Sequence, residues 1–461
     1  MTISGSRALA DGFLRRAWLV LLALSLGACG ELPPPAHPNI VVILADDLGS
    51  GDIAWTRSGS TDPIATPNLD RLAASGVVLE QFRTAPLCTP ARAALLTGRA
   101  PARLGLLRNI SAKDQGGLDP HVATLPETLR AAGYATSLVG KWHLGHASAE
   151  MRPVRRGFDH FVGVLGGWID YQTHARAKTA DWWRGETALV QEGHATRLLA
   201  DEAVRVIRER DLTKPLYLHI AFNAPHAPTS VPPGRSIDEV PGADPVRRQY
   251  ALLVDELDRA VGRVLAALDD EGLRARTIVL FASDNGAPAG FGGSNGGLRE
   301  GKGTVYDGAL RVPAIVSWPT ELAAGRSALA VNAVDVMPTL CAAAGVVLAS
   351  DPERDGVDLW PALRNARVPP SRTAYFGVER ADGTSLAAFD GRWKLVVHGD
   401  AGRAELYDVL ADPTESRDLA AAEALIVARF TAELAPWRAL PHLPFVPDEG
   451  PQRGKSGDAS K

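Results

Sequence analysis

Ten residues of this chain are of types that bind a cation, hold an anion or transfer a proton, and they lie in short motifs. They are Asp46, Asp47, Cys88, Arg92, Lys141, His143, His226, Asp284, Asn285 and Lys302. Carboxylate and amide oxygens are hard ligands that suit Ca²⁺ or Mg²⁺. Lysine and arginine side chains hold anions, and histidine titrates near neutral pH. This set of residues is typical of chemistry on an anionic group beside a divalent cation.

Cys88 opens the run Cys88-Thr89-Pro90-Ala91-Arg92. We expect a short helix here, because Thr89 suits a cap, Pro90 suits a first turn and Gly98 suits the position just after a helix. Cys88 would then lie at the positive end of the helix dipole, where an oxyanion is stabilised. The alternative is a buried structural cysteine, which is the usual role of a lone cysteine.

Continuous apolar runs predict buried parallel strands over residues 39–45, 135–139, 216–222 and 277–282. Helical patterns lie between them, near residues 67–75, 126–132, 203–210 and 253–268. A polar motif follows each strand: Asp46 with Asp47, Lys141 with His143, His226, and Asp284 with Asn285. Since the carboxyl ends of parallel strands share one edge, where open α/β folds bind ligands, we expect these motifs to meet there.

The alternation of strands and helices predicts an α/β fold with a large mixed, mostly parallel sheet between helices. We assign residues 38–350 to this catalytic domain. Residues 351–440 read instead as a small subdomain of short antiparallel strands (373–378, 386–389, 393–397 and 405–408) and one helix (421–435). The charged tail, 441–461, has the composition of a disordered segment.

The N-terminus has the pattern of an export signal. Arg15 and Arg16 precede a short apolar stretch and the run Leu26-Gly27-Ala28-Cys29, which resembles a bacterial lipobox. Residues 1–29 are therefore predicted to be a lipoprotein signal peptide, and 30–37 a proline-rich tether. A plain signal peptide cut nearby is the alternative. We expect an exported periplasmic or cell-surface protein that contacts the membrane only through a lipid on Cys29.

Composition excludes some other classes. The 461-residue chain has a formal net charge of −4, whereas a nucleic-acid binder normally has a basic face. Its three cysteines cannot form a disulfide framework. Cys341 lies in an apolar helical stretch and is expected to be buried.

Taken together, these motifs resemble those of the type I sulfatases. The pattern Cys-x-Pro-x-Arg before Leu-Thr-Gly-Arg is similar to the family signature, and 301–313 resembles its Gly-Lys-x-Thr block, with Asp307 in place of the usual Glu. The resemblance implies an alkaline-phosphatase-like fold and oxidation of Cys88 to formylglycine by a maturation enzyme. It also implies a divalent cation, usually Ca²⁺ with Mg²⁺ as the alternative, bound by Asp46, Asp47, Asp284, Asn285 and the modified Cys88.

The same resemblance implies a mechanism. One hydroxyl of the hydrated aldehyde at position 88 attacks the sulfur of a sulfate ester, aided by the metal and by Asp284, while His226 and Lys302 assist the departing alcohol. A base such as His143 then deprotonates the second hydroxyl, which expels sulfate and restores the aldehyde. Arg92 holds the hydrate and the metal ligands, and Lys141 bridges the hydrate and the sulfate.

Within the family, the motifs are most similar to the arylsulfatase B, or N-acetylgalactosamine 4-sulfatase, group. One departure is Trp168, which stands where related enzymes often have a serine near the sulfate. The aromatic residues nearby, which are Trp168, Tyr171, Trp182 and Trp183, could stack on a substrate ring or belong to the core.

Two other functions remain open at this point. Hydrolysis of phosphate or phosphonate esters is one, because relatives on the same fold share the cationic site. The other is a non-catalytic lipoprotein that binds sulfated glycans. The complete set of polar residues favours hydrolysis of a sulfate monoester, on a sugar or an aryl group.

Overall fold

A ten-stranded sheet forms the centre of the computed structural model, which describes residues 37–446 apart from 57–58, 60–61, 366–370 and 400. The strand order across the sheet is β12 (Gly325–Asn332), β2 (Val77–Arg83), β11 (Ala314–Ser317), β10 (Thr277–Ser283), β1 (Asn39–Ala45), β9 (Leu216–Ala221), β3 (Ala135–Lys141), β4 (His160–Val164), β7 (Trp183–Arg184) and β8 (Thr187–Ala188). From β10 to β4 all neighbours are parallel, and antiparallel pairs occur at β11 and β7. The predicted mixed, mostly parallel sheet is confirmed.

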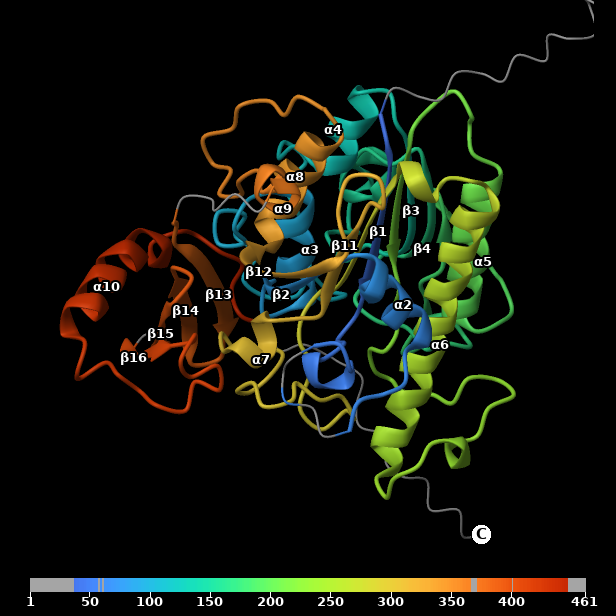
Figure 1. The fold of residues 1–461 in the computed structure, drawn as a ribbon. Coiled ribbons are helices and arrows are strands. Elements are labelled where there is room, and N and C mark those ends of the chain that lie inside the picture. The colour runs from blue at the N-terminus through green and yellow to red at the C-terminus, as the bar shows by residue number, and fades with distance from the viewer. Residues whose placement is uncertain (1–36, 57–58, 60–61, 366–370, 400, 447–461) are drawn as a thin grey trace, which may run out of the picture.

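Helices cover both faces of this sheet (Figure 1). One face packs against α2 (Pro67–Ser75), α5 (Ala195–Arg208) and α6 (Pro245–Asp270), and the other against α3 (Cys88–Thr97), α4 (Leu125–Ala131) and α8 (Val336–Ala343), with α9 (Trp360–Asn365) beside α8. The side chains of the central strand β1 show why both faces of the sheet are covered. Ile40, Val42 and Leu44 join one hydrophobic cluster, while Val41 and Ile43 join the other. The apolar run is thus buried on both sides, as predicted. Cys341 is buried in α8, also as predicted.

The helix that carries Cys88 begins earlier than the sequence suggests. Cys88 is its first residue and Leu87 precedes it as the cap, so the prediction of Thr89 as the cap is wrong. The Thr89 hydroxyl is used elsewhere, because it donates to the backbone carbonyl of His143 at 2.9 Å. Gly98 ends the helix in a left-handed conformation, with φ 69°, as expected.

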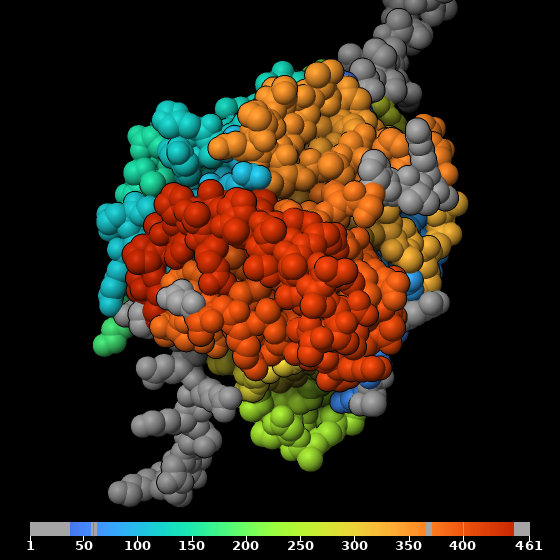
Figure 2. All heavy atoms as spheres, turned by 90° about the vertical axis from the view of Figure 1, so that its left-hand side faces the viewer, coloured from blue at the N-terminus to red at the C-terminus, as the bar shows by residue number. Residues whose placement is uncertain are grey.

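A smaller subdomain follows the main sheet. It consists of the antiparallel strands β13 (Ala374–Arg380), β14 (Gly383–Phe389), β15 (Trp393–His398) and β16 (Arg403–Asp408) and the helix α10 (Ala424–Arg438). Figure 2 shows its atoms, in red, lying against the preceding segment of the chain. One face of this sheet packs on α10, and the other packs on the segment that contains α7 (Asp307–Leu310).

The predicted signal peptide, 1–29, most of the predicted tether and residues 447–461 of the predicted tail lie outside the described residues. Residues 441–446, also assigned to the tail from the sequence, contact the loop near Gly105. In the described part of the chain, no helix has the length and apolar character needed to cross a membrane. A small hairpin of β5 (Ala175–Arg176) and β6 (Thr179–Ala180) completes the elements.

A buried ion cluster joins the two sheets. Lys394 Nζ of β15 lies 2.8 Å from both Asp307 Oδ1 and Glu415 Oε1, and Arg83 Nη2 of β2 lies 2.6 Å from Asp307 Oδ2. All four side chains are excluded from solvent. Burial alone would raise the pKa of Asp307, but Arg83 and Lys394 outweigh it and lower that pKa. The subdomain is therefore attached to the main sheet through buried ion pairs. If the two parts separated, these charged groups would lose their partners.

Replacing Lys394 by methionine should destabilise the protein strongly, because Glu415 would lose its buried cationic partner. We expect the free energy of unfolding to fall by about 3–5 kcal/mol. Arg155→Ala is the matched control, since the pair of Arg155 with Glu186 is exposed to solvent and contributes little to stability. Denaturant unfolding of both variants measures the difference. Equal, small losses would contradict the role assigned to the buried cluster.

Candidate active site

Two polar pairs meet where strands β1 and β10 end. The strands are parallel and in register, with Ala45 beside Ser283, so Asp46 and Asp47 emerge next to Asp284 and Asn285. Asn285 Nδ2 donates to Asp47 Oδ1 at 2.7 Å, and the backbone N–H of Asp47 donates to Asp284 Oδ1 at 3.3 Å. All four residues are buried. The predicted convergence of these two motifs is confirmed.

Asp47 turns the chain sharply at this edge. Its φ of 67° lies in the left-handed region, which is uncommon for a residue other than glycine and is concentrated at functional sites. Neighbouring elements hold the turn: Tyr250 of α6 donates its hydroxyl to the Asp47 carbonyl at 3.1 Å, and the Leu48 N–H donates to Ser283 Oγ at 3.0 Å. The carboxylate of Asp47 is thus directed by packing from two other parts of the chain.

Cys88 faces these carboxylates from the first turn of α3. Its Sγ lies 3.4 Å from Asp46 Oδ1, and ligand atoms of Asp46, Asp47, Cys88 and His226 all lie within 4.8 Å of one another. Burial, together with the negative charge of Asp284, raises the pKa of the Cys88 thiol well above its ordinary value. An unmodified thiol here stays neutral and is a poor nucleophile.

Three cationic side chains pair with the three carboxylates. Lys141 Nζ lies 2.6 Å from Asp46 Oδ2, and Lys302 Nζ lies 2.7 Å from Asp47 Oδ1. Arg92 binds Asp284 Oδ2 through Nη2 at 2.7 Å and Nε at 3.1 Å. Each buried carboxylate therefore has a cationic partner within hydrogen-bond distance.

The pairing of Lys302 with Asp47 shifts both pKa values. Burial opposes the charge on each group. For Asp47, the positive charge of Lys302 outweighs burial and lowers the pKa. For Lys302, the negative charge of Asp47 outweighs burial and raises the pKa well above its ordinary value. Lys302 is therefore an ammonium group at neutral pH.

His143 lies beside the cluster in a defined tautomer. Its Nε2 is 3.0 Å from the carbonyl oxygen of Ile110, which can only accept, so Nε2 carries the proton. Nδ1 is buried and has no hydrogen-bond partner among the described residues. Burial, reinforced by the positive charges of Lys141 and Arg92, lowers the pKa of His143 well below its usual value. The ring is thus neutral, with a lone pair on Nδ1 available for a proton.

His226 contacts the cluster through Asp47, with Nε2 3.5 Å from Asp47 Oδ2 and Nδ1 against the backbone carbonyl of Ala227. Burial, together with the positive charge of Lys302, lowers its pKa. Tyr171 holds the loop that carries His226, because its hydroxyl lies 2.9 Å from the carbonyl oxygens of both Asn223 and His226. Tyr171 therefore fixes the backbone on which His226 stands.

Direct contacts join nine of the ten predicted residues into one cluster, and Thr89 links His143 to its edge. Lys141 is the last residue of β3 and does not lie beyond it as predicted. Sequence reasoning missed Thr89, Tyr171 and the carbonyl of Ile110 as supporting groups. A backbone carbonyl leaves no pattern in a sequence, so nothing could have indicated Ile110.

The aromatic residues near this site divide into two groups. Tyr171 and Trp182 are buried, and Tyr171 stacks on His194 with ring centroids 5.0 Å apart, so these two belong to the core. Trp168 and Trp183 are partly exposed. A contact with substrate remains a prediction for these two tryptophans.

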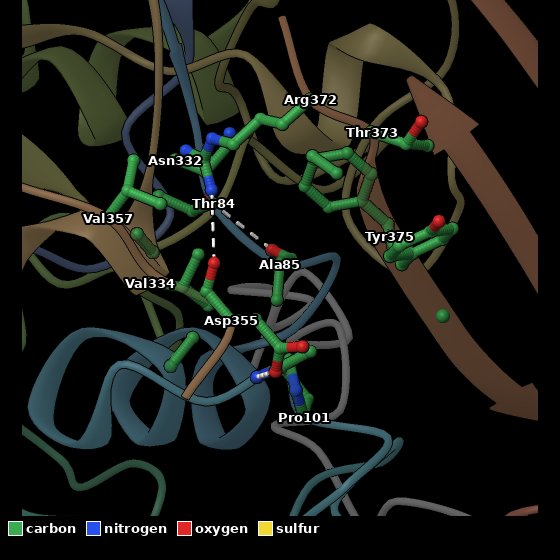
Figure 3. A pocket seen from close by; sticks show the side chains of 16 residues that line it. Thr84, Ala85, Pro101, Asn332, Val334, Asp355, Val357, Arg372, Thr373 and Tyr375 are labelled. Atoms are coloured by element: carbon green, nitrogen blue, oxygen red, sulfur yellow. Dashed lines mark hydrogen bonds between the residues drawn. The ribbon is translucent and has the colours of Figure 1, made fainter. Parts of the chain in front are cut away.

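A separate cavity of about 230 Å³ lies behind α3, between the main sheet and the subdomain (Figure 3). Its lining is mainly apolar, and includes Ala85, Val334 and Val357. Arg372 reaches into it, but this guanidinium is paired with Asp335 and donates to the Asp355 carbonyl at 3.2 Å. Among the residues that the structure describes, the cavity offers no unpaired cation to a sulfate, so the cluster around Cys88 is the better candidate for the active site.

Comparison with known proteins agrees with this geometry. A model of the sulfatase family matches residues 38–346. The chain is 35% identical to a steryl-sulfatase of Mus musculus over 75% of this chain and 68% of that protein. It is 35% identical to an N-acetylgalactosamine-6-sulfatase of Canis lupus familiaris over 82% of this chain and 75% of that protein. The chain therefore belongs to the sulfatase family and is a hydrolase of sulfate esters.

Solved structures agree on the fold. Ps i-CgsB in complex with k-i-k-neocarrahexaose has a TM-score of 0.83 and 29% identity, and the match covers 88% of this chain and 94% of that one. A phosphonate monoester hydrolase of Agrobacterium radiobacter has a TM-score of 0.65 at 23% identity, which shows a shared fold alone. The curated relatives have several names, and they do not single out the N-acetylgalactosamine 4-sulfatase group expected from the motifs.

Gly167→Ala should slow catalysis by displacing His143. A Cβ at position 167 would lie 2.7 Å from His143 Cε1 and Nε2, so the ring would have to move away from Ile110. We expect kcat to fall about 10- to 100-fold, the scale of a misplaced catalytic group. Gly325→Ala is the control, because a Cβ there meets no atom within 4 Å. Steady-state kinetics on an aryl sulfate compares them, and unchanged kcat in Gly167→Ala would disprove the predicted clash.

Proposed function

We propose that this sulfatase uses Cys88, oxidised to formylglycine, as its nucleophile. The observation that carries the proposal is the position of Cys88 Sγ, which lies 3.4 Å from Asp46 Oδ1 and close enough to Arg92, Lys141 and Lys302 for their charges to act on it. The raised pKa of the thiol argues against direct use of a thiolate. A formylglycine-generating enzyme would be the maturation partner.

We further propose that a divalent cation binds to Asp46, Asp47, Asp284 and Asn285, next to the modified Cys88. The donor set fits, because it consists of hard oxygens. Asn285 supports the fit, since in the described part of the chain its buried Oδ1 has no hydrogen-bond partner, while its Nδ2 donates to Asp47. When bound, the cation would polarise a sulfate oxygen and the nucleophile. The oxygen ligands suit Ca²⁺, as in the family, and Mg²⁺ is the alternative.

The residues around position 88 would have different roles in the reaction, which depend on their charge and protonation state. Arg92 is fixed by Asp284 and the Lys141 carbonyl, so it would orient the nucleophile. Lys141 and Lys302 would bind sulfate oxygens. Lys302 carries a proton at neutral pH and can donate it to the departing alcohol oxygen while the S–O bond breaks.

The two histidines would act at different stages. His226 is neutral and becomes a donor to the alcohol only after Nε2 takes up a proton. His143 would take a proton on Nδ1 from the remaining hydroxyl of the nucleophile, and release of sulfate would then restore the aldehyde. The different contacts of the two histidines support this assignment, because His226 Nε2 lies beside Asp47 whereas His143 Nε2 is held by the Ile110 carbonyl.

We infer that the substrate is a sulfate monoester on a saccharide. Support comes from the neocarrahexaose bound by Ps i-CgsB and from the name of the N-acetylgalactosamine-6-sulfatase relatives. An exported enzyme would meet such glycans outside the cytoplasm, and the run Leu26-Gly27-Ala28-Cys29 supports a lipid-anchored location.

Mass spectrometry of protein from its native host should find an aldehyde in the tryptic peptide that contains Cys88. Cys341, the other free and buried cysteine of the described chain, is the internal control and should remain a thiol. Cys88→Ala should lower kcat by about 10³-fold or more, as expected when a nucleophile is removed. Cys341→Ala should keep its activity. Full sulfatase activity with an intact thiol at position 88 would rule out the proposed nucleophile.

Calcium should stabilise chelator-treated protein, because it would bind the folded site and not the unfolded chain. At a concentration about 100 times Kd, the expected gain is about 2.7 kcal/mol in the free energy of unfolding. Calorimetry with CaCl₂ or MgCl₂ measures the shift and ranks the two ions. Asp47→Asn should abolish it, whereas Asp238→Asn, at an 85% exposed side chain, should not. An equal shift in both variants would place the cation elsewhere.

A further inference from the structure

One loop, residues 105–114, touches both the nucleophile helix and His143. The Ile110 carbonyl accepts from His143 Nε2 at 3.0 Å, and Asn109 Oδ1 accepts from the N–H of Thr89, next to Cys88, at 3.1 Å. The Thr89 hydroxyl closes the network by accepting from the Ile110 N–H at 3.2 Å and donating to the His143 carbonyl at 2.9 Å. The position of this loop therefore sets the start of α3 and the tautomer of His143.

Arg108 holds the loop together from inside. It is only 4% exposed, and it binds Asp114 through Nη1 at 2.7 Å and Nη2 at 2.8 Å. Nη1 also donates to the Asn109 carbonyl at 2.8 Å. Hydrogen bonds from Arg108 lower the pKa of Asp114 to about 2. This two-point pairing gives the loop a defined shape, because the guanidinium fork fits a carboxylate in a single orientation.

A segment far along the chain supplies the remaining contact of Arg108. Residues 441–446, which we term the C-terminal strap, lie over the loop. Arg108 Nε donates to the Pro444 carbonyl at 2.5 Å, and the Leu443 N–H donates to the Gly105 carbonyl at 2.9 Å. Gly105 permits this approach, since its φ is 67° and a Cβ there would lie 3.3 Å from the Pro441 carbonyl oxygen.

The strap is also tied to the C-terminal sheet. His442 Nε2 lies 3.2 Å from Thr384 Oγ1 of β14, and its Nδ1 lies 3.5 Å from Glu379 Oε2 of β13. The Glu379 N–H in turn donates to the Leu107 carbonyl at 2.8 Å. The loop is thus fixed on one side by the active site and on the other by the subdomain and the strap.

We propose that the C-terminal strap and Arg108 are positioning elements of the sulfatase reaction, which act through the Ile110 carbonyl on His143 and through Asn109 on the Cys88 helix. The inference rests on the proposed function of His143 as the base. A loop that moves lets Nε2 lose its acceptor, and the proton is then no longer confined to that nitrogen. Nδ1 would cease to be a permanently free base, although His143 itself is unchanged.

Arg108→Gln, in the full chain, is the main test. We expect kcat on an aryl sulfate to fall about 10- to 100-fold, because small misplacements of catalytic groups have effects of this size. KM should stay within about twofold, since Arg108 is buried and its guanidinium is paired with Asp114. Leu443→Asp, which loosens the strap without altering Arg108, should reproduce the loss in smaller measure.

Arg103→Ala is the matched control. Arg103 lies two residues before Gly105, where the loop starts. Its guanidinium pairs with Asp355 at 2.9 Å and lies over the ring of Trp437. It makes no contact with Asn109 or Ile110 in the described structure. This variant should lower Tm while kcat stays at the wild-type value.

¹⁵N NMR of the His143 ring provides a readout that does not depend on turnover. The wild type should show a protonated Nε2, and Arg108→Gln and Leu443→Asp should show a mixture of tautomers. Variants that lose Tm but keep both kcat and the Nε2–H signal would overturn the proposal. If wild-type protein carrying the aldehyde hydrolysed no sulfate ester, the proposed function would fail instead. The NMR measurement would still show whether the strap controls the tautomer of His143.

Discussion

Pairing of buried charge at the carboxyl edge of the sheet is the constraint on which this site depends. Three carboxylates and three cationic side chains are enclosed there, and each would be costly to bury alone. Their charges balance while the two histidines are neutral. A divalent cation added to this set leaves an excess of positive charge, which an anionic group can offset. The same pairing that makes the residues compatible with folding therefore prepares the site for a sulfate ester.

The second buried ion cluster makes the C-terminal subdomain part of that arrangement. Lys302 ends in the active site, and Asp307, five residues later, ends in the cluster with Lys394. Between them, Gly303 donates its N–H to the Pro86 carbonyl at 2.8 Å, and its own carbonyl accepts from Arg380 at 2.8 Å. The segment that delivers Lys302 is thus anchored on both sides. Loss of the subdomain would free Lys302 as well as lower stability.

The sequence was informative where one physical signal dominated. The runs at 39–45 and 277–282 are apolar after their first residue, and both form buried parallel strands with the expected bounds to within a residue. Strands β2 and β11 were not predicted. Glu80 and Gln81 interrupt the apolar pattern of β2, and β11 is only four residues long. Helix α5 starts at Ala195, eight residues before its predicted start, since its packing face begins before the pattern becomes clear.

The residue types of the site were readable from the sequence, but their pairings were not. Nothing in the motifs says that Lys302 would bind Asp47 or that Arg92 would bind Asp284, because such choices depend on distances between strands. The same limit applies to protonation. The proposed action of His143 as a base on Nδ1 depends on the carbonyl of residue 110, which accepts the hydrogen bond from Nε2. The motifs therefore indicate the type of reaction. A backbone atom outside every motif determines which nitrogen of His143 carries the proton.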